Sequence, residues 1–358
     1  FEILIGGGLG RTPMIAKKDR QFLPERHLLS YIEAILRVYN LLGRRDNKYK
    51  ARIKIMVHEL GIDEVGEMVE DEWERIKTSE LELPAEEIAR IEKYFQAPAY
   101  EPMVVEDTGF AAKRFEDKAF AQWVRSNVAP HKQPGYAIVN LSVKPEGQPP
   151  GDVTDAQMDA IADLAETYSM DELRVTHEQN LVFPYVKQAE LYELWQKLAE
   201  QDLATANVGL AGDIIACPGL DYCSLASARS IPVAQRISKR FADLDRQHDI
   251  GELRIKISGC INACGHHHVG HIGLLGVDRR GEEYYQITLG GAPGEDASVG
   301  SIIGPALSSD DIVDAVEELV HVFIEWRREG ERFLDTYRRV GAGPFKTRLY
   351  EERFNAAA

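Results

Sequence analysis

The sequence predicts an α+β fold in which a ferredoxin-like βαββα unit lies between two mixed α/β domains. Three observations support this prediction. Residues 135–200 carry strand and helix patterns in the order βαββα, residues 1–61 and 284–341 share one succession of strand, glycine turn and helices, and every cysteine lies within 217–264. We expect three domains, which comprise residues 1–98, 99–205 and 206–358.

The composition excludes several classes of protein. Of the 358 residues, 44% are hydrophobic and 28% are charged, as in ordinary globular proteins. The net charge of −16 argues against a broad basic face, so we expect no nucleic-acid partner. An apolar run long enough to span a membrane and a secretory signal are both missing from the sequence, so we expect no membrane partner. Four cysteines without a secretion signal predict a location in the reducing cytoplasm.

The first element is an apolar run, "FEILIGGGLG" at 1–10, which ends in glycines and therefore predicts a strand and a tight turn. "YYQITLGGAPG" at 284–294 has the same pattern. A helical apolar stripe follows each run, and "LSSDD" at 307–311 predicts a cap for the second helix. The first stripe consists of Leu28, Leu29, Ile32, Ile35, Leu36, Tyr39 and Leu42, and the second of Ile312, Val313, Val316, Leu319, Val320 and Phe323.

A basic break and a further helical segment follow both stripes, at 43–61 and 327–341. This parallel predicts an internal duplication, although two unrelated α/β units would give the same pattern. The second copy is preceded by a segment that carries all the cysteines, whereas the first copy has no such segment before it. We therefore expect the chain to be the later portion of a longer, duplicated protein.

The segment between the copies has its own pattern. A helix at 83–102 ends in a proline-rich linker, and 103–134 is less regular, with Phe120 and Trp123 expected as packing anchors. The βαββα elements are then a strand at 135–143, a helix at 154–169, strands at 172–176 and 180–186, and a helix at 188–201. We expect Thr154 to cap the first of these helices. Its expected apolar face is Met158, Ile161, Leu164 and Ala165.

The cysteine spacing is C-x5-C in "CPGLDYC" (217–223), followed after 36 residues by C-x3-C in "CINAC" (260–264). Structural zinc sites usually contain C-x2-4-C pairs, and disulfides are disfavoured in the cytoplasm. Iron–sulfur clusters take four thiolates with more variable spacing. Gly219, Gly259 and Gly265 would let backbone N–H groups approach sulfur. The spacing favours a cluster, and a zinc site or four free structural cysteines remain alternatives.

Two other motifs carry weaker signals. His266, His267, His268 and His271 follow the last cysteine directly and could bind a metal, but no second ligand motif accompanies them. We therefore favour packing and hydrogen bonding for these rings. "GGGLGR" at 6–11 lacks the Lys and Ser or Thr of a phosphate-binding loop, so it predicts only a tight turn near an anionic group.

Four segments together resemble the sirohaem-dependent sulfite and nitrite reductases: "CPGLDYC", "SGCINACG", "GGGLGRT" and "ELRVTHEQNL". The resemblance covers nearly the whole chain but only the later portion of those two-fold duplicated proteins. It implies a sirohaem reductase-like α+β fold. Residues 1–98 would be the end of a first sirohaem/iron–sulfur repeat that is truncated at its N-terminus, 99–205 a ferredoxin-like half-domain, and 206–358 the second repeat, with the cluster cysteines.

The resemblance also implies cofactors and their ligands. A [4Fe–4S] cluster would be bound by Cys217, Cys223, Cys260 and Cys264, and Cys264 would in addition be the proximal ligand of the sirohaem iron. Asn262 would lie against the macrocycle, Gln179 and Asn180 would face it from the ferredoxin-like unit, and Gly8, Arg11 and Thr12 would lie near its carboxylates. A guanidinium can bind a carboxylate through two hydrogen bonds, which suits Arg11. Ordinary caps and turns are the alternative interpretation of these polar residues.

The implied activity is the six-electron reduction of sulfite to sulfide, with electrons from a ferredoxin or a flavoprotein. The alternatives are reduction of nitrite to ammonia and a non-catalytic, metal-free or zinc-binding fragment. In the family, most of the Arg and Lys side chains that hold the substrate come from the earlier half, so we identify no catalytic residue here and expect the missing half as a partner. His266 also stands where other members have an arginine, a departure from the family pattern.

Overall fold

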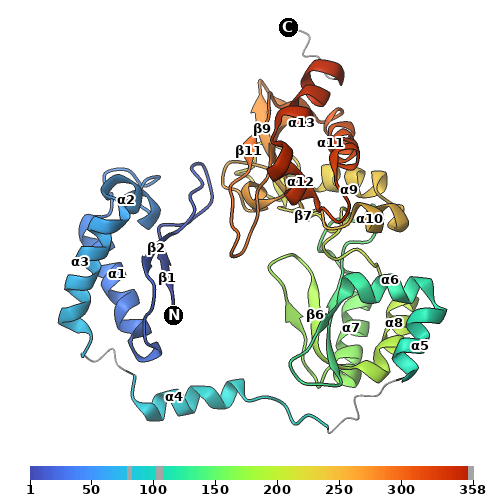
Figure 1. The fold of residues 1–358 in the computed structure, drawn as a ribbon, viewed down its shortest axis with the longest axis horizontal. Coiled ribbons are helices and arrows are strands. Elements are labelled where there is room, and N and C mark those ends of the chain that lie inside the picture. Colours follow the sequence, from blue (N-terminus) through green and yellow to red (C-terminus); the bar gives the residue numbers. More distant parts are fainter. Residues whose placement is uncertain (79–82, 102–107, 354–358) are drawn as a thin grey trace. The chain divides into compact units, whose positions relative to one another are not determined.

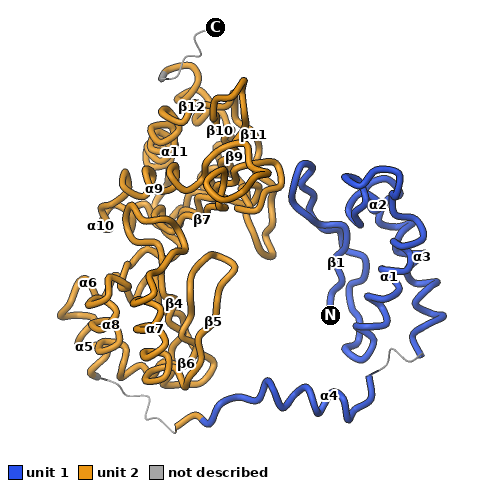
Figure 2. Tube along the Cα trace, turned by 180° about the vertical axis from the view of Figure 1, so that it is seen from behind, with its two compact units in different colours: residues 1–99 blue, residues 100–358 orange. Residues whose placement is uncertain are grey.

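The computed structural model describes residues 1–78, 83–101 and 108–353, and the chain divides into two compact units, Phe1–Ala99 and Tyr100–Ala358 (Figure 1, Figure 2). Both units combine helices with sheets, and unit 2 contains the ferredoxin-like element order, which confirms the predicted α+β class.

Unit 1 begins with a two-stranded antiparallel sheet. Strand β1 (Ile3–Ile5) pairs with β2 (Lys17–Arg20). The helices that follow are η1 (Glu25–His27), α1 (Leu28–Leu42), α2 (Ile53–Leu60), α3 (Ile62–Ile76), α4 (Ala85–Glu92) and η2 (Lys93–Phe95). The core lies between the sheet, α1, α2 and α3. Within 83–101 the chain forms the predicted helix, α4 with η2, and leaves helical structure before Pro98, as expected for a linker; residue 102 lies outside the described residues.

The predicted apolar face of α1 is partly wrong, although Leu28, Ile35 and Tyr39 do lie in or against the core. Ile35 is buried, but Leu29, Ile32 and Leu36 are 46%, 41% and 47% exposed, and Leu42 is exposed as well. The buried face is formed instead by Ser30, Tyr31, Ala34, Ile35 and Val38. Two of these side chains are polar, and both have partners: the Tyr31 hydroxyl lies 2.9 Å from Asp19 and 2.8 Å from Glu70, and the Ser30 hydroxyl accepts a hydrogen bond from Trp73. The polar groups on the buried face therefore have hydrogen-bond partners within unit 1.

The first half of unit 2 contains the predicted βαββα order. Its elements are α5 (Thr108–Glu116), α6 (Lys118–Asn127), β3 (Val128–Pro130), β4 (Tyr136–Leu141), α7 (Asp155–Tyr168), β5 (Arg174–Val175), β6 (Leu181–Lys187), η3 (Gln188–Glu190) and α8 (Leu191–Glu200). The strands form an antiparallel sheet in the order β3-β4-β6-β5. Ala137, Val139 and Leu141 alternate along β4 and share one core with α6, α7 and α8, so these helices cover one face of the sheet.

Local details of this half bear out most of the sequence analysis. Thr154 caps α7 in a capping box with Gln157, and Phe120 and Trp123 are fully buried, as predicted. Met158 does not belong to the buried face, because its side chain is 61% exposed. The segment expected to be irregular is also more ordered than predicted, since it forms α5, α6 and β3. Helix α6 has a local start signal, because the side chain of Asp117 accepts a hydrogen bond from the N–H of Phe120.

The second half of unit 2 is built on a six-stranded sheet in the order β11-β10-β9-β8-β7, with β12 paired to β10. Strands β7, β8 and β9 are mutually parallel, and the other pairs are antiparallel. The strands are β7 (Ile215–Ala216), β8 (Ile255–Ser258), β9 (Ile272–Arg279), β10 (Glu282–Leu289), β11 (Ser301–Ile302) and β12 (Leu307–Ser308). The helices are η4 (Gly219–Asp221), α9 (Ile231–Arg240), α10 (Leu244–Ile250), η5 (His267–Val269), α11 (Ile312–Trp326), α12 (Phe333–Val340), α13 (Gly343–Thr347) and η6 (Arg348–Arg353).

Helix α11 has the apolar face that the sequence predicts. All six residues of the second stripe are buried in the large core cluster of this half. The "LSSDD" segment contributes the hydroxyl of Ser308, which accepts a hydrogen bond from the N–H of Asp311 at 3.2 Å, just before the helix begins. Asp311 itself, at the N-cap position, makes no side-chain capping bond.

The two units repeat one another residue for residue around their glycine turns. Adding 284 to each residue number converts the β1–β2 pair Ile5–Lys17 into the β10–β11 pair Leu289–Ser301. The same shift converts the antiparallel bridge Gly8–Met14 into Ala292–Ser298, and α1 into α11. Gly6 and Gly290, which correspond, both have φ +83°. The side chains on the loop differ, because Arg11 and Thr12 correspond to Glu295 and Asp296.

Candidate iron–sulfur and cofactor site

The sheet of unit 2 brings the two cysteine segments together. Cys217 is the first residue after β7, and Cys260 is the second residue after β8. These two strands are parallel neighbours. The carboxyl ends of parallel strands meet at one edge of a sheet, so both segments begin at the same place. Burial raises the pKa of the Cys264 thiol, and the nearby thiols of Cys217, Cys260 and Cys223 raise it further. All four thiols are free and close enough to interact.

Glycines allow this close approach. The N–H of Gly259 donates to the sulfur of Cys217 at 3.1 Å, as the sequence analysis expected for this glycine. Its carbonyl accepts from the N–H groups of Ser227 and Ala228 at 2.8 and 3.0 Å, which joins the two cysteine segments. A Cβ on Gly259 would lie 2.6 Å from the carbonyl oxygen of Ala228, so any larger residue would force the segments apart.

The four thiols match the ligand set of an iron–sulfur cluster, because a [4Fe–4S] cubane takes four thiolates. Within the described ranges, the structure contains no group of three His, Cys, Asp or Glu side chains arranged to hold a metal ion. Cys217 and Cys260 are buried, Cys223 is half-buried, and Cys264 is exposed. The exposed Cys264 leaves its sulfur accessible to a second group.

Gln179 acts on the cysteine segment through the backbone. It adopts a left-handed conformation (φ +58°), and its side-chain amide makes two hydrogen bonds with Ala216, one from Nε2 to the carbonyl at 2.9 Å and one from the Ala216 N–H to Oε1 at 3.0 Å. Ala216 immediately precedes Cys217. Gln179 therefore links the ferredoxin-like sheet to the segment that begins with Cys217.

The side chain of Asn180 is committed to an interior network. It is buried, its Nδ2 donates to Asp213 at 3.0 Å, and its Oδ1 accepts from the N–H of Val143 at 3.3 Å. Asp213 also accepts a hydrogen bond from the ammonium of Lys144 at 2.6 Å, and the two side chains form an ion pair that is almost fully buried. Lys144 and Asp213 were not predicted as a pair, because they are 69 positions apart and the local sequence around each gives no signal of the other.

Asn262 and the histidines surround the last cysteine. Asn262 and His266 are exposed, and His266 has a left-handed backbone (φ +55°). His267 is fully buried, and neither of its ring nitrogens has a hydrogen-bond partner among the residues that the structure describes. Burial lowers the pKa of His267 to about 3, so this ring is neutral. His271 is also buried, and its Nδ1 accepts from the N–H of Arg254 at 3.3 Å.

The glycine loop of unit 1 holds its predicted residues in a fixed shape. Gly8 pairs with Met14 through two backbone hydrogen bonds of 3.0 and 2.9 Å. The buried Lys54, which the sequence analysis missed, donates to the carbonyls of Leu9 and Thr12 at 2.7 and 2.6 Å. Arg11 and Thr12 are exposed, and among the described residues the Arg11 guanidinium has no hydrogen-bond or ion-pair partner. A loop fixed in this way can present Arg11 to an anionic group.

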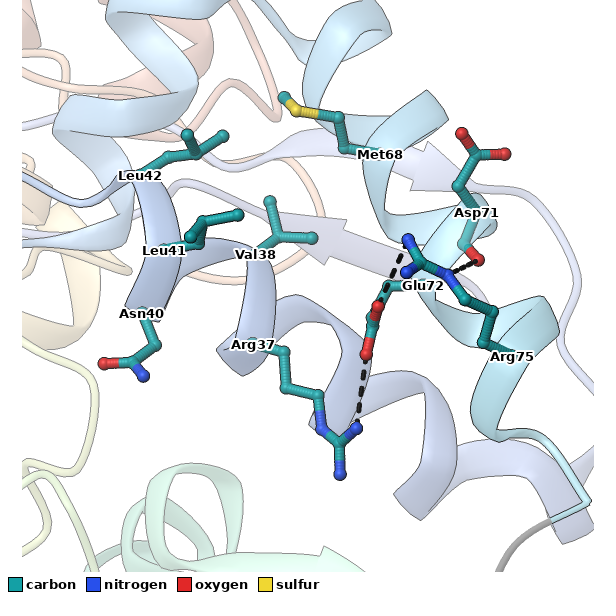
Figure 3. A pocket seen from close by; sticks show the side chains of 9 residues that line it. All are labelled: Arg37, Val38, Asn40, Leu41, Leu42, Met68, Asp71, Glu72 and Arg75. Atoms are coloured by element: carbon teal, nitrogen blue, oxygen red, sulfur yellow. Dashed lines mark hydrogen bonds and ion pairs between the residues drawn. The ribbon is translucent and has the colours of Figure 1, made fainter.

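A groove between α1 and α3 is a separate feature of unit 1 (Figure 3). It has a volume of about 500 Å³, and Val38, Leu41, Leu42 and Met68 form its apolar part. Its charged residues pair with one another: Glu72 lies 3.2 Å from Arg37 and 3.4 Å from Arg75. The groove contains none of the predicted cofactor residues.

The chain is similar to proteins of known function. Residues 1–77 and 211–357 match the profile of the nitrite and sulphite reductase 4Fe-4S domain, and residues 130–201 match the nitrite/sulfite reductase ferredoxin-like half domain. A sulfite reductase [ferredoxin] 2 of Mycolicibacterium paratuberculosis is 28% identical over 93% of this chain and 55% of its own length. A chloroplastic ferredoxin–nitrite reductase of Zea mays is 30% identical over 89% of this chain and 51% of its own length.

A solved structure shows the same fold. The Mycobacterium tuberculosis NirA protein superposes with a TM-score of 0.71 and 25% identity, over 96% of this chain and 58% of that chain. The chain thus spans about half the length of the curated relatives it matches. In the part of the chain that the structure describes, no helix is long and apolar enough to cross a membrane.

Proposed function

Because this chain belongs to the nitrite and sulphite reductase family, whose named relatives are oxidoreductases, we propose that it is the cluster-bearing portion of a sulfite reductase. The observation that carries the proposal is the convergence of four free thiols at the carboxyl ends of β7 and β8. We assign residues 1–98, 99–205 and 206–358 to its three domains.

We assign the cofactor ligands as follows. Cys217, Cys223, Cys260 and Cys264 would hold a [4Fe–4S] cluster, and the exposed Cys264 would in addition be a ligand of the sirohaem iron. When bound, the coupled cofactors supply the six-electron reduction of sulfite to sulfide. Gln179 holds Ala216 and thereby fixes the start of the cysteine segment.

The remaining predicted residues have supporting parts in this proposal. Arg11, whose loop is fixed by Lys54, offers a guanidinium to a carboxylate of sirohaem. Asn262 lies on the exposed turn between the last two cysteines, where a macrocycle bound to Cys264 would contact it. Asn180 does not contact the macrocycle in this proposal; it stabilises the interior of unit 2 through its hydrogen bond to Asp213.

The substrate and the electron donor belong to the proposal as well. Nitrite, reduced to ammonia, is the second candidate substrate, since the similar proteins include both sulfite and nitrite reductases. The donor is ferredoxin, as in the names of those relatives, with a flavoprotein as the alternative. The four free cysteines suit a reducing compartment such as the cytoplasm.

We further propose that unit 1 is completed by a segment outside residues 1–358, the earlier half of the same protein. The support is a comparison within the chain. Leu29, Ile32 and Leu36 are exposed on α1, whereas their counterparts on α11, Val313, Val316 and Val320, are buried in a core that α9 shares. A helix equivalent to α9 would bury the α1 face in the same way.

Substitution of Ile32 tests this completion. Ile32→Glu should leave the stability of the 358-residue chain unchanged and should destabilise a longer chain that contains the earlier half. Val316→Glu, at the equivalent buried position of α11, should destabilise both chains. An Ile32→Glu variant that is neutral in both chains contradicts the proposed completion.

Iron and acid-labile sulfide content after anaerobic reconstitution tests the cluster. The wild-type chain should bind about four cluster irons, and Cys223→Ala should lose them with its fold retained. Tyr222→Phe is the matched control, because Tyr222 is exposed in the same segment and holds no metal in the proposal. A wild-type chain that binds one zinc ion or no metal would support the non-catalytic fragment instead. Assays with sulfite and with nitrite, on the chain combined with its earlier half, then distinguish the two substrates.

A further inference from the structure

A buried lysine lies beneath the cluster segment. Strand β8 directs Ile255 and Ile257 into the large core, so Lys256 and Ser258 point to the opposite face of the sheet. Lys256 is only 2% exposed. Its neighbours in the adjacent strands are Ile215 and Gly273.

Lys256 differs from the other buried lysines in having no partner. Lys144 pairs with Asp213, and Lys54 donates to two carbonyls. Within the described residues, the Lys256 ammonium has neither a hydrogen bond nor an ion pair. Burial of an ammonium without a partner costs several kcal/mol of stability, as a rule. Such a group therefore indicates a ligand that supplies the missing negative charge.

The surrounding charges do not compensate for Lys256. Glu178 and Asp213 attract it, and Arg254 and Lys144 repel it. Asp213 is already paired with Lys144, and Glu178 with Arg254. Arg254 also pairs with Glu252 at 3.0 Å. Each of these carboxylates therefore already has a cationic partner, and Lys256 is the cation without one. Burial lowers its pKa, in agreement with this lack of a counter-ion.

The position of Lys256 places this excess charge beside the last cysteine. The hydroxyl of Ser258 accepts a hydrogen bond from the N–H of Gly265 at 3.1 Å, so the Cys264–Gly265 turn lies over this face of β8. Lys256 is two residues away along the strand, a separation of roughly 7 Å. Its charge also acts on His266, the residue that follows Gly265.

We propose that Lys256 binds an anionic group of a ligand, either a carboxylate or an oxyanion, beside Cys264. The inference rests on the proposed function, which supplies both candidate sources: a carboxylate of sirohaem, or the oxyanion substrate sulfite or nitrite. A charge-assisted hydrogen bond from a desolvated ammonium gives such a group both affinity and a fixed position.

The test compares Lys256→Met, which keeps the length of the side chain but removes the charge, with Lys256→Arg, which keeps the charge. Without ligand, Lys256→Met should have a urea midpoint at least as high as that of the wild-type chain, because an unpaired buried charge has been removed. Lys144→Met, the matched control, should lower the midpoint, because it leaves Asp213 unpaired. A Lys256→Met variant that loses as much stability as Lys144→Met overturns the proposal, since Lys256 would then have a structural partner.

Binding of defined probes identifies the anion. Sirohaem, its carboxyl methyl ester, sulfite and nitrite are titrated into the wild-type chain and both variants, and affinity is followed by visible absorption and by the shift in unfolding temperature. For a carboxylate ligand, Lys256→Met should weaken sirohaem on the order of 10- to 100-fold, leave the ester unaffected, and be partly rescued in Lys256→Arg. For an oxyanion ligand, Lys256→Met should show the same loss of affinity with sulfite or nitrite instead of with sirohaem.

Equal affinities in Lys256→Met and wild type for every probe, or failure of the wild-type chain to bind any of them, overturn the proposal. The outcome is separable from that of the proposed function, because Lys256 is not a cluster ligand. Lys256→Met should retain the iron and sulfide content of the wild-type chain. Normal cluster content with unchanged anion affinity contradicts the role of Lys256 alone, whereas a wild-type chain without a cluster contradicts the proposed function.

Discussion

The substitution Asp213→Asn should destabilise unit 2 strongly. Asp213 accepts three hydrogen bonds, from the ammonium of Lys144 at 2.6 Å, from Nδ2 of Asn180 at 3.0 Å and from the N–H of Gly209 at 2.8 Å. The amide removes the negative charge and turns an NH₂ group toward one of these donors. Because Lys144 and Asp213 are only 2% and 5% exposed, the ammonium would remain buried without its counter-ion. Breaking one partner of such a pair costs about 3–5 kcal/mol.

Urea unfolding followed by circular dichroism and tryptophan fluorescence measures this loss. In a unit of this size, about 3–5 kcal/mol corresponds to a decrease in Tm of roughly 6–20 °C. Asp245→Asn is the matched control: Asp245 also forms an ion pair with a lysine of the ferredoxin-like half, Lys118 at 2.7 Å, but this pair is exposed and its loss should leave stability unchanged. A loss below about 1 kcal/mol for Asp213→Asn would refute the conclusion that the Lys144 ammonium depends on Asp213 as its buried counter-ion. The double variant Lys144→Met/Asp213→Leu should recover most of the loss, because no unpaired charge remains.

Three further predictions concern local features. Thr154→Ala removes the capping box of α7 and should cost about 1 kcal/mol in urea unfolding; an unchanged midpoint would contradict the role of the cap. Gly259→Ala should reduce bound iron while the fold is retained, because its Cβ would lie 2.6 Å from a carbonyl oxygen, whereas Gly343→Ala, with no atom within 4 Å, should bind iron normally. Burial lowers the pKa of His271 to about 4, so folding excludes the proton that the unfolded chain binds below about 6.5. Its stabilising contribution is complete above pH 6.5 and should decrease by about 2 kcal/mol between pH 7.5 and pH 5; His271→Leu should remove this part of the pH dependence, and an unaltered dependence would argue against it.

Local signals explain why much of the fold was predictable from the sequence. Thr154 with Gln157 signals the start of α7, and the six apolar residues from Ile312 to Phe323 recur at helical spacing and are all buried. The cysteine pairs follow β7 and β8, so their meeting at one sheet edge follows from the strand order. In each case the deciding interaction lies within a few residues or within one pair of neighbouring strands.

The features that were missed depend on distant partners. The buried face of α1 includes Ser30 and Tyr31, which are buried only because Trp73, Asp19 and Glu70 provide hydrogen bonds. Nothing in the sequence near Ser30 or Tyr31 announces those partners. The roles of Lys54 and Lys144 likewise depend on groups 34 or more residues away. Polar groups in the interior are therefore the part of this structure that a pattern of hydrophobicity describes least well.

The residue-for-residue equivalence of the two glycine loops restricts how each loop can evolve. Both bridges, Gly8–Met14 and Ala292–Ser298, join residues six positions apart, and each is followed by the same strand register. An insertion or deletion of one residue would exchange the two faces of the returning strand. Replacement of side chains at the tip leaves the hydrogen-bonded frame intact, as the change from Arg11 and Thr12 to Glu295 and Asp296 illustrates. The number of residues in the loop is thus constrained, whereas the charge of its side chains is free to change. A change of charge can let one loop bind a ligand that the other loop does not bind.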